Sequence, residues 1–188
     1  MGSVNIVYSL KLAKHCLKCD VGGEPSFSVT KGYFIIPEDL TERGVSVLLS
    51  VIESSTTPST RPKLVTITTN AIDDRLYSLL PLPLKAFYSW GLRIPLADKV
   101  NQEKVVKHAA GWDGDGMGWL GAKNMVVVRP SILTFGECMA DKGGDAYRVG
   151  QELGSAWTVS RADVAHFVAE RVITNWDEWA GEAWVVSY

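Results

Sequence analysis

A continuous apolar and β-branched run over residues 64–69 is the feature that most constrains this chain. Runs of this kind form strands buried on both faces of a parallel sheet, and parallel strands need crossover connections, usually helices. The run ends in Thr68 and Thr69, and a helical segment carrying Lys99 follows it. Because doubly wound α/β sheets place their sites beyond the carboxyl ends of their strands, we expect a site at these residues.

Further segments with helical or strand periodicity surround this run. Helices are predicted after Pro37, over residues 96–110 and after Ser160, where Asp163 completes a capping box. Their predicted inward residues are Leu40, Val47, Leu48, Val51 and Ile52, then Leu96, Val100, Val106 and Ala109, then Val164, Phe167, Val168 and Val172. Three other strands are predicted, over residues 1–7, 125–128 and 183–187.

This alternation predicts an α/β fold with a doubly wound, mostly parallel, Rossmann-like sheet. Residues 11–31 are rich in turn-forming residues and are expected to be loop. Gly22-Gly23 has no strand at turn distance before it, so it does not replace a GxGxxG phosphate loop. We expect a single domain over residues 1–188, an incomplete Rossmann-like fold that lacks the first βαβ half with its glycine loop. Its part over residues 1–36 is expected to be reduced or irregular, because two βαβ units do not fit there.

Charge and hydropathy exclude several classes of partner. The formal net charge of -2 gives no electrostatic basis for binding nucleic acid or an anionic membrane surface. The sequence holds no run of about 18 apolar residues and no secretory leader at Met1. We therefore expect a cytoplasmic protein with a small-molecule substrate and without nucleic-acid or membrane partners. The open edge of an incomplete sheet favours a homodimer.

Two segments contain potential metal ligands. Cys16 and Cys19 form a CxxC, but no second CxxC or histidine pair follows at the spacing that zinc requires. The glycine-rich residues 111–121 contain Asp113 and Asp115 but lack the ligand pattern of an EF-hand loop. We expect no metal site, and we interpret the glycine-rich segment as a flexible connector.

The segment between the predicted strand and the Lys99 helix is apolar and aromatic. Its prolines are expected to exclude a regular helix or inner strand over residues 79–84, so its apolar groups are expected to line or cover a cleft. Tyr88 and Trp90 of this segment, with Tyr147 further along the chain, are the candidate substrate-binding residues. The alternative is that these rings pack in the core or an interface.

Four short pieces in sequence resemble one known family. The pieces are Ala97-Asp98-Lys99-Val100 followed by Glu103, Val127-Val128-Arg129-Pro130-Ser131-Ile132-Leu133, Tyr147-Arg148-Val149-Gly150, and Ser160-Arg161-Ala162-Asp163-Val164-Ala165. Their order and spacing over about residues 37–188 resemble the NAD(P)H-binding, NmrA-like group of atypical short-chain dehydrogenases/reductases. Within it, the chain resembles the averufin-oxidase type of oxidoreductase from fungal aromatic-polyketide pathways.

The resemblance implies an active site and a cofactor. It implies that Thr68 and Thr69 take the place of the family's active-site hydroxyl, and that Lys99 takes the place of the lysine that holds the nicotinamide ribose. The positions that would follow the strand beneath the nicotinamide are Arg129, Pro130 and Ser131. The implied catalytic residues are thus Lys99, Thr68 and Thr69, and the implied cofactor is NADP or NAD.

The chain departs from the family pattern at two points. Pro95 stands where family members with a full catalytic set carry a tyrosine four residues before the lysine. The candidate replacements for this acid are Tyr77, Tyr88 and Tyr147. The second departure is the missing glycine loop, so weak cofactor binding is expected. From the residues alone, the threonines also suit ordinary strand positions, and Lys99 suits a solvated helix position paired with Glu103.

Three functional hypotheses follow. The first is an NAD(P)-dependent oxidoreductase, or the remnant of one, that acts on a small apolar or aromatic carbonyl or quinone compound in secondary metabolism. The second is a cofactor-deficient NmrA-like binding or regulatory protein without hydride transfer. The third is a truncated gene product in which Met1 is internal to a longer protein.

Overall fold

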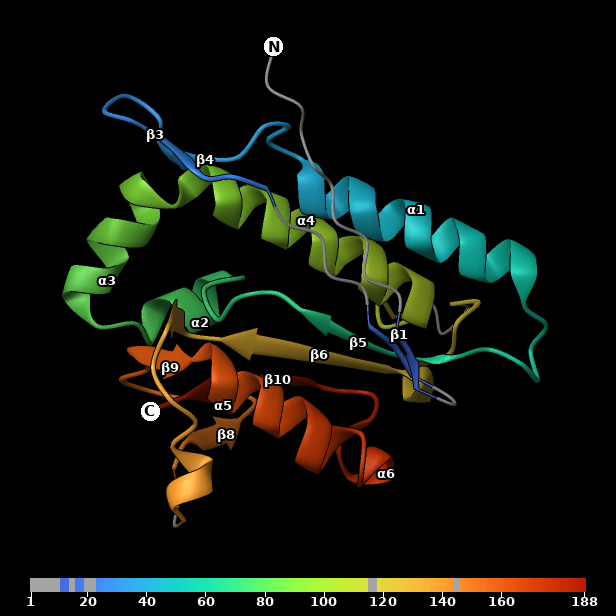
Figure 1. The fold of residues 1–188 in the computed structure, drawn as a ribbon. Coiled ribbons are helices and arrows are strands. Elements are labelled where there is room, and N and C mark those ends of the chain that lie inside the picture. The colour runs from blue at the N-terminus through green and yellow to red at the C-terminus, as the bar shows by residue number, and fades with distance from the viewer. Residues whose placement is uncertain (1–10, 14–15, 19–22, 115–117, 144–145) are drawn as a thin grey trace.

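A six-stranded sheet forms the centre of the computed structural model, which describes residues 11–13, 16–18, 23–114, 118–143 and 146–188 (Figure 1). In spatial order its strands are β1 (Lys11–Ala13), β2 (Cys16–Lys18), β5 (Lys63–Ile67), β6 (Met125–Pro130), β10 (Ala183–Ser187) and β8 (Arg148–Gly150). The four strands from β2 to β10 run parallel, and β1 and β8 pair antiparallel at the two edges. The predicted mostly parallel sheet is therefore present.

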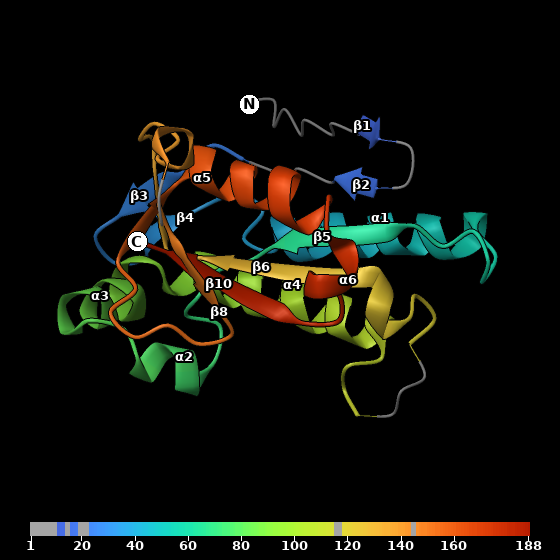
Figure 2. The same cartoon turned by 90° about the horizontal axis from the view of Figure 1, so that it is seen from below.

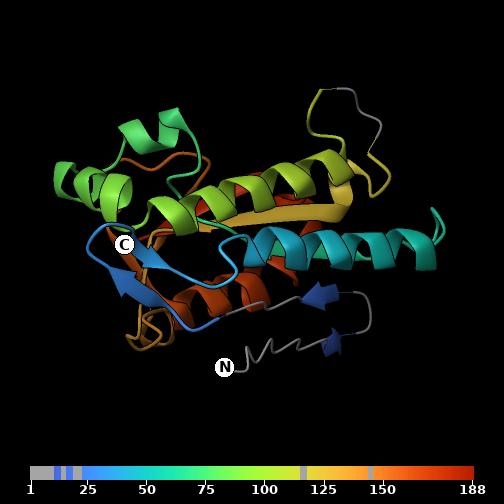
Figure 3. The same ribbon diagram turned by 90° about the horizontal axis from the view of Figure 1, so that it is seen from above.

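Helices cover both faces of this sheet, as a doubly wound fold requires. On one face lie α1 (Leu40–Ser55) and α4 (Arg93–Ala110), side by side in Figure 3. The other face is covered by α5 (Arg161–His166), the π-helical turn η4 (Phe167–Val172) and α6 (Trp176–Trp179) (Figure 2). Side chains alternate along a strand, so Met125 and Val127 pack under α1 and α4 while Val126 and Val128 pack under α5 and η4.

The predicted buried stripe of α1 is partly wrong. Val47 and Val51 are exposed, and Val45 and Leu49 are buried instead. The buried positions 40, 41, 44, 45, 49 and 52 follow the helical period on the side that faces α4 and the sheet. An apolar residue on the opposite side stays exposed because α1 has no neighbour there within the described part of the chain.

The prediction that prolines exclude a helix after residue 79 is wrong. The segment contains α2 (Asp74–Ser78), α3 (Leu82–Ala86) and the π-helical turn η1 (Phe87–Gly91). Pro81 is the N-cap of α3 and Pro83 lies in its first turn. The first N–H groups of a helix have no intrahelical partner, so proline begins this helix at little cost.

The expectation of loop over residues 11–31 is also wrong. Besides β1 and β2, this region holds the strand β3 (Ser26–Ser28), which pairs antiparallel with β4 (Gly32–Phe34). Strand β2 precedes Gly22-Gly23 at turn distance, contrary to our reading, although residues 19–22 themselves lie outside the described part, as does the strand predicted over residues 1–7. Whether the first βαβ half is lacking stays a prediction.

Several other predictions of structure are confirmed. Helix α4 begins at Arg93, three residues before its predicted start, and ends at Ala110 as predicted. It is capped by Gly111, whose left-handed conformation suits glycine. Ser160 is the N-cap of α5 and accepts a hydrogen bond from the backbone N–H of Asp163. The other short elements are β7 (Ile132–Thr134), parallel to β9 (Thr158–Ser160), and the 3-10 turns η2 (Ala122–Asn124) and η3 (Ala140–Lys142). Within the described ranges, every helix is too short or too polar to cross a membrane.

Candidate active site

Polar residues gather where β5, β6 and β10 end at one edge of the sheet. Backbone hydrogen bonds continue the pairing past the strands, from Thr68 N to Val128 O at 2.9 Å, and from Ser131 N to Val186 O at 3.0 Å. Thr68 and Ser131 are buried in this position. The carboxyl ends of parallel strands are where α/β sheets carry their sites, so this edge is the candidate active site.

A buried carboxylate, Glu103 of α4, ties this edge together. Thr68 Oγ1 donates to Glu103 Oε2 at 2.8 Å, and Arg129 Nε donates to the same oxygen at 3.2 Å. The other oxygen accepts from the Arg129 guanidinium and from Lys107 Nζ, the latter at 2.8 Å. Burial raises the pKa of Glu103, but Arg129 and Lys107 outweigh it and hold the pKa below its ordinary value. Glu103 is therefore a carboxylate at neutral pH, and it accepts a hydrogen bond from the Thr68 hydroxyl.

Lys99 reaches the same strand end from one turn earlier on α4. Its Nζ donates to Gln102 Oε1 at 2.9 Å and to Ile67 O, the last residue of β5, at 3.4 Å. Gln102 in turn donates from Nε2 to Thr66 Oγ1 at 3.1 Å. The structure thus brings Lys99 and Thr68 to one end of one strand, with the lysine half-buried.

A second polar group at this edge surrounds Tyr88 of η1. The Tyr88 hydroxyl donates to Asn70 Oδ1 at 3.3 Å, and Asn70 Nδ2 donates to Ser131 Oγ at 3.3 Å. Burial raises the pKa of the Tyr88 hydroxyl, and a hydrogen bond with the Thr69 side chain opposes that rise. Tyr88 is therefore a neutral hydroxyl at physiological pH. Sequence reasoning missed Asn70, although it directly follows the two strand-end threonines.

Two of the predicted substrate-binding residues lie elsewhere. Trp90 is half exposed. Its ring packs edge-on against Phe27 of β3, with 6.1 Å between the ring centroids. Tyr147 packs in the core under α5, where its hydroxyl is 2.8 Å from His166 Nδ1. Burial raises the pKa of Tyr147. Pro130, the last residue of β6, is buried in the sheet. Its carbonyl oxygen accepts a hydrogen bond from the Asn70 backbone N–H at 3.1 Å.

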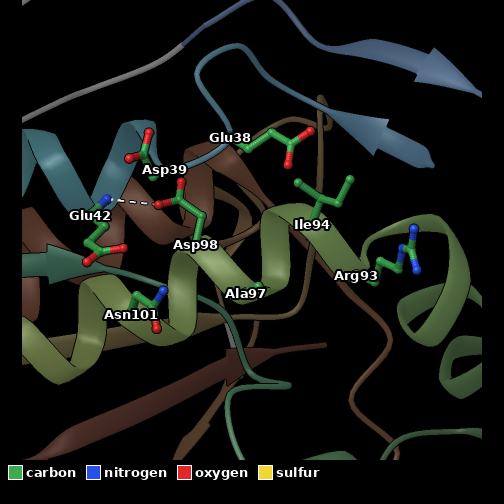
Figure 4. A pocket seen from close by; sticks show the side chains of 8 residues that line it. All are labelled: Glu38, Asp39, Glu42, Arg93, Ile94, Ala97, Asp98 and Asn101. Atoms are coloured by element: carbon green, nitrogen blue, oxygen red, sulfur yellow. Dashed lines mark hydrogen bonds between the residues drawn. The ribbon is translucent and has the colours of Figure 1, made fainter.

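Two hollows flank the first half of α4. One, of about 350 Å³, opens between η1 and α4 and is mostly apolar; it is lined by Tyr88, Ser89, Arg93, Leu96, Ala97, Val100 and Asn101. The other, of about 420 Å³, opens between α1 and α4 and is lined by Glu38, Asp39, Glu42, Arg93, Ile94, Ala97, Asp98 and Asn101 (Figure 4). The predicted wall over residues 79–90 therefore contributes its last part to the apolar hollow.

The second hollow contains the start of α1, which is capped from α4. The Asp98 carboxylate accepts from Thr41 N at 3.0 Å, Thr41 Oγ1 at 2.7 Å and Glu42 N at 2.9 Å. The N-cap residue itself, Asp39, makes no side-chain capping bond within the described structure. Sequence reasoning treated Asp98 only as a neighbour of Lys99, because a cap supplied by another helix leaves no local spacing signal.

This donor set does not fit the pyrophosphate of a dinucleotide. In Rossmann-like folds the pyrophosphate lies at the N-terminus of the helix that follows the first strand. Helix α1 is not that helix, because it joins β2 to β5 on the face that α4 also covers, and α4 joins β5 to β6. Asp98 also bonds two of its first N–H groups already. The hollow there is lined by four carboxylates and one arginine.

Potential metal ligands are scattered among the residues that the structure describes. No group of three or more His, Cys, Asp or Glu side chains there is placed to hold a metal ion. Of the predicted CxxC, Cys19 and the Cys16 side chain lie outside the description. Cys138 is a free thiol whose Sγ donates to Asp163 Oδ1 at 3.5 Å.

Known proteins share both sequence and fold with this chain. It is similar to Reductase pytE of Aspergillus terreus, with 34% identity over 150 residues, which is 76% of this chain and 55% of that protein. The chain thus spans about half the length of this relative. No protein-family model matches the sequence.

Two solved structures share the fold at low sequence identity. A short-chain dehydrogenase/reductase from Veillonella parvula superposes with a TM-score of 0.53 at 10% identity, covering 78% of this chain and 57% of that one. A protein from Lactobacillus casei gives the same TM-score and identity, covering 80% and 63%. At such identities the likeness shows a common α/β fold.

Proposed function

We propose that this chain is an NAD(P)-dependent oxidoreductase, or the remnant of one, of the NmrA-like short-chain type. The observation that carries the proposal is the meeting of Lys99 with the end of β5 beside Thr68. It is supported by the 34% identity to a reductase. The proposal treats residues 1–188 as a single cofactor-binding-like domain and assigns it to secondary metabolism.

The substrate class follows from the hollow next to the site. Reduction of a carbonyl needs a donor where negative charge develops on the oxygen. Lys99 supplies a positive charge at the strand end, and Tyr88, whose neutral hydroxyl donates to Asn70, lines the apolar hollow of about 350 Å³. We propose a small apolar or aromatic carbonyl or quinone compound as the substrate. Thr68 helps to position Glu103 and does not bond the substrate, because its hydroxyl already donates a hydrogen bond to Glu103.

The test is NADPH-dependent reduction of a panel of aromatic aldehydes and quinones by the wild-type chain and by Lys99→Ala. We expect Lys99→Ala to abolish turnover with a nearly unchanged melting temperature. The matched control is Lys104→Ala, which removes an exposed lysine from the same helix and is expected to keep turnover. Retained turnover in Lys99→Ala would remove this residue from the site.

A second candidate function is a binding or regulatory protein without hydride transfer. The acid-lined start of α1 favours it, because phosphate groups are repelled there. Turnover separates the two functions, because both predict weak NADPH binding. Micromolar NADPH affinity, measured by tryptophan fluorescence, would contradict that shared expectation. Binding of an aromatic ligand without turnover of any panel member favours the second function.

A further inference from the structure

The Gln102 side chain bridges the Lys99 amine and the central strand β5, and both ends of its amide are used. We propose that Gln102 is a positioning residue that fixes the Lys99 ammonium at the strand end, with Thr66 holding the Gln102 amide. This inference rests on the proposed function and deepens it, because it says how the chain places the positive charge that the function assigns to Lys99.

Of the two acceptors described above, Gln102 lies nearer to the Lys99 amine. The two residues are three positions apart on α4, so their side chains share one face of the helix. Lys99 Nζ is 2.9 Å from Gln102 Oε1, an ordinary hydrogen-bond length, and 3.4 Å from Ile67 O, which is long for such a bond. Because a lysine amine is a compact charge on a flexible stem, the shorter contact decides where it lies.

The buried surroundings of Gln102 fix which way its amide points. Gln102 and Thr66 are both buried, and Gln102 Nε2 donates to Thr66 Oγ1 at 3.1 Å. An ammonium group only donates hydrogen bonds, so the amide must turn its oxygen to Lys99 and its NH₂ group to Thr66. Thr66 is itself held in the sheet by its pairing with Val127 of β6. The sheet therefore fixes Lys99 through one intervening side chain.

A neutral amide holds the lysine without cancelling its charge. The next residue on α4, Glu103, is a carboxylate and pairs with two cations. A carboxylate at position 102 would pair with Lys99 in the same way and compensate its positive charge. The Gln102 amide leaves that charge for the oxygen of a carbonyl substrate, where negative charge develops during reduction. Position 102 therefore suits a glutamine and not a glutamate.

The experiment measures how fast the Lys99 amine reacts with acetic anhydride in the folded chain, relative to the exposed Lys104 of the same helix, by mass spectrometry. Gln102→Met keeps the side-chain length and removes both hydrogen bonds. Thr66→Val removes the hydroxyl and keeps the branched shape, and Gln102→Glu keeps an acceptor and adds a charge. Gln151→Met is the matched control, because it makes the same chemical change at an exposed glutamine outside α4.

We expect Lys99 to react about tenfold faster in Gln102→Met, the factor for one lost hydrogen bond to a charged group. Thr66→Val should raise the rate roughly threefold, as for a neutral hydrogen bond, and should add little to Gln102→Met, because both changes act through one contact. Gln102→Glu and Gln151→Met should react no faster than the wild-type chain. An unchanged rate in Gln102→Met overturns the inference, as does an equal gain in Gln151→Met. If Gln102→Met does not fold, an unchanged rate in Thr66→Val overturns it.

Turnover of the aldehyde and quinone panel gives the second readout. Gln102→Met and Gln102→Glu should each lower kcat roughly tenfold at an unchanged KM, the first because the charge moves and the second because it is compensated. A merely structural role would spare Gln102→Glu, in which the amine keeps its place. Wild-type kcat in Gln102→Glu would therefore overturn the inference.

The labelling needs neither cofactor nor substrate, so the inference and the proposed function fail separately. If the wild-type chain turns over no member of the panel, the proposed function falls, and the labelling rate of Lys99 still decides the inference. If the wild-type chain is active and Lys99 reacts at the wild-type rate in Gln102→Met, the function stands and the inference falls.

Discussion

Two buried carboxylates on opposite faces of the sheet are held in different ways. On the α4 face, Glu103 is surrounded by the cations Arg129 and Lys107, with one hydroxyl from Thr68. The negative charge of Glu103 is therefore compensated by two positive charges. Because Arg129 is itself buried, each partner depends on the other for its solvation.

On the α5 face, Asp163 is held mainly by neutral donors. Its carboxylate accepts from the Tyr188 hydroxyl at 2.6 Å, from Ser160 Oγ at 2.8 Å and from Ala140 N at 3.0 Å. Burial raises the pKa of Asp163, but these hydrogen bonds, that of Tyr188 first, bring the pKa down to about 2. The contrast teaches that a depressed pKa needs no ion pair, and that the two sites should fail differently when the carboxylate is removed.

The largest difference is expected when the carboxylate of the ion-paired site is deleted. Glu103→Ala leaves the Arg129 guanidinium buried without its partner, which should lower the free energy of unfolding by roughly 3–5 kcal/mol. Urea unfolding at pH 7 measures this. The double variant Glu103→Leu with Arg129→Met is expected to recover most of the loss, because no lone charge remains. A cost below about 1 kcal/mol for the single variant would show that Arg129 finds water instead.

At the neutral-donor site the corresponding loss should be smaller. Asp163→Asn keeps one acceptor oxygen and strands no cation, so we expect the free energy of unfolding to fall by about 2 kcal/mol, the range for hydrogen bonds to a charged group. The same urea experiment measures it, with the exposed Asp177→Asn on α6 as the control. A loss equal to that of Glu103→Ala would erase the proposed distinction.

Acid should weaken both sites. The folded pKa of Asp163 is about 2 against an ordinary 3.8, and that of Glu103 also lies below its ordinary value, so the unfolded chain binds more protons as pH falls below about 5. Their stabilisation is present at neutral pH and is lost on acidification, with Asp163 contributing about 2 kcal/mol at pH 7. Unfolding measured between pH 7 and pH 3 checks this. Asp163→Asn should show a shallower decline, and a parallel decline would contradict the assignment.

The smallest effects concern single hydroxyl donors. Tyr188→Phe removes a donor from a carboxylate that has few alternatives, and should cost about 1.5 kcal/mol. Thr68→Val removes a donor from a carboxylate that keeps both cations, and should cost about 0.5 kcal/mol. Chemical denaturation of the two variants side by side gives the comparison. The reverse order would mean that Arg129 and Lys107 do not satisfy Glu103.

The central strands and the capped helix were predictable because their signals are local. The apolar runs at β5 and β6, and the pairing of Ser160 with Asp163, lie within a few residues of one another. Strands β1 and β2 carry no such run. They are strands because each has a partner strand to pair with, which the sequence alone does not display.

The meeting of Lys99 with the end of β5 was predictable, but the contacts around it were not. Lys99 and the strand-end threonines could be placed at one edge because α/β topology brings helix and strand ends together. That Thr68 donates to Glu103, 35 residues away, could not be read from spacing. Neither could the cap of α1 by Asp98, 57 residues from Thr41, because only tertiary packing creates it.

That borrowed cap has a consequence for how the protein is made. The ribosome delivers Thr41 57 residues before Asp98, a delay of roughly 3 to 11 s at ordinary rates of synthesis. Throughout that interval the first turn of α1 has unsatisfied N–H groups and is expected to fray. The nascent chain therefore completes its first long helix only when the second has emerged and docked, so the two mature as one unit.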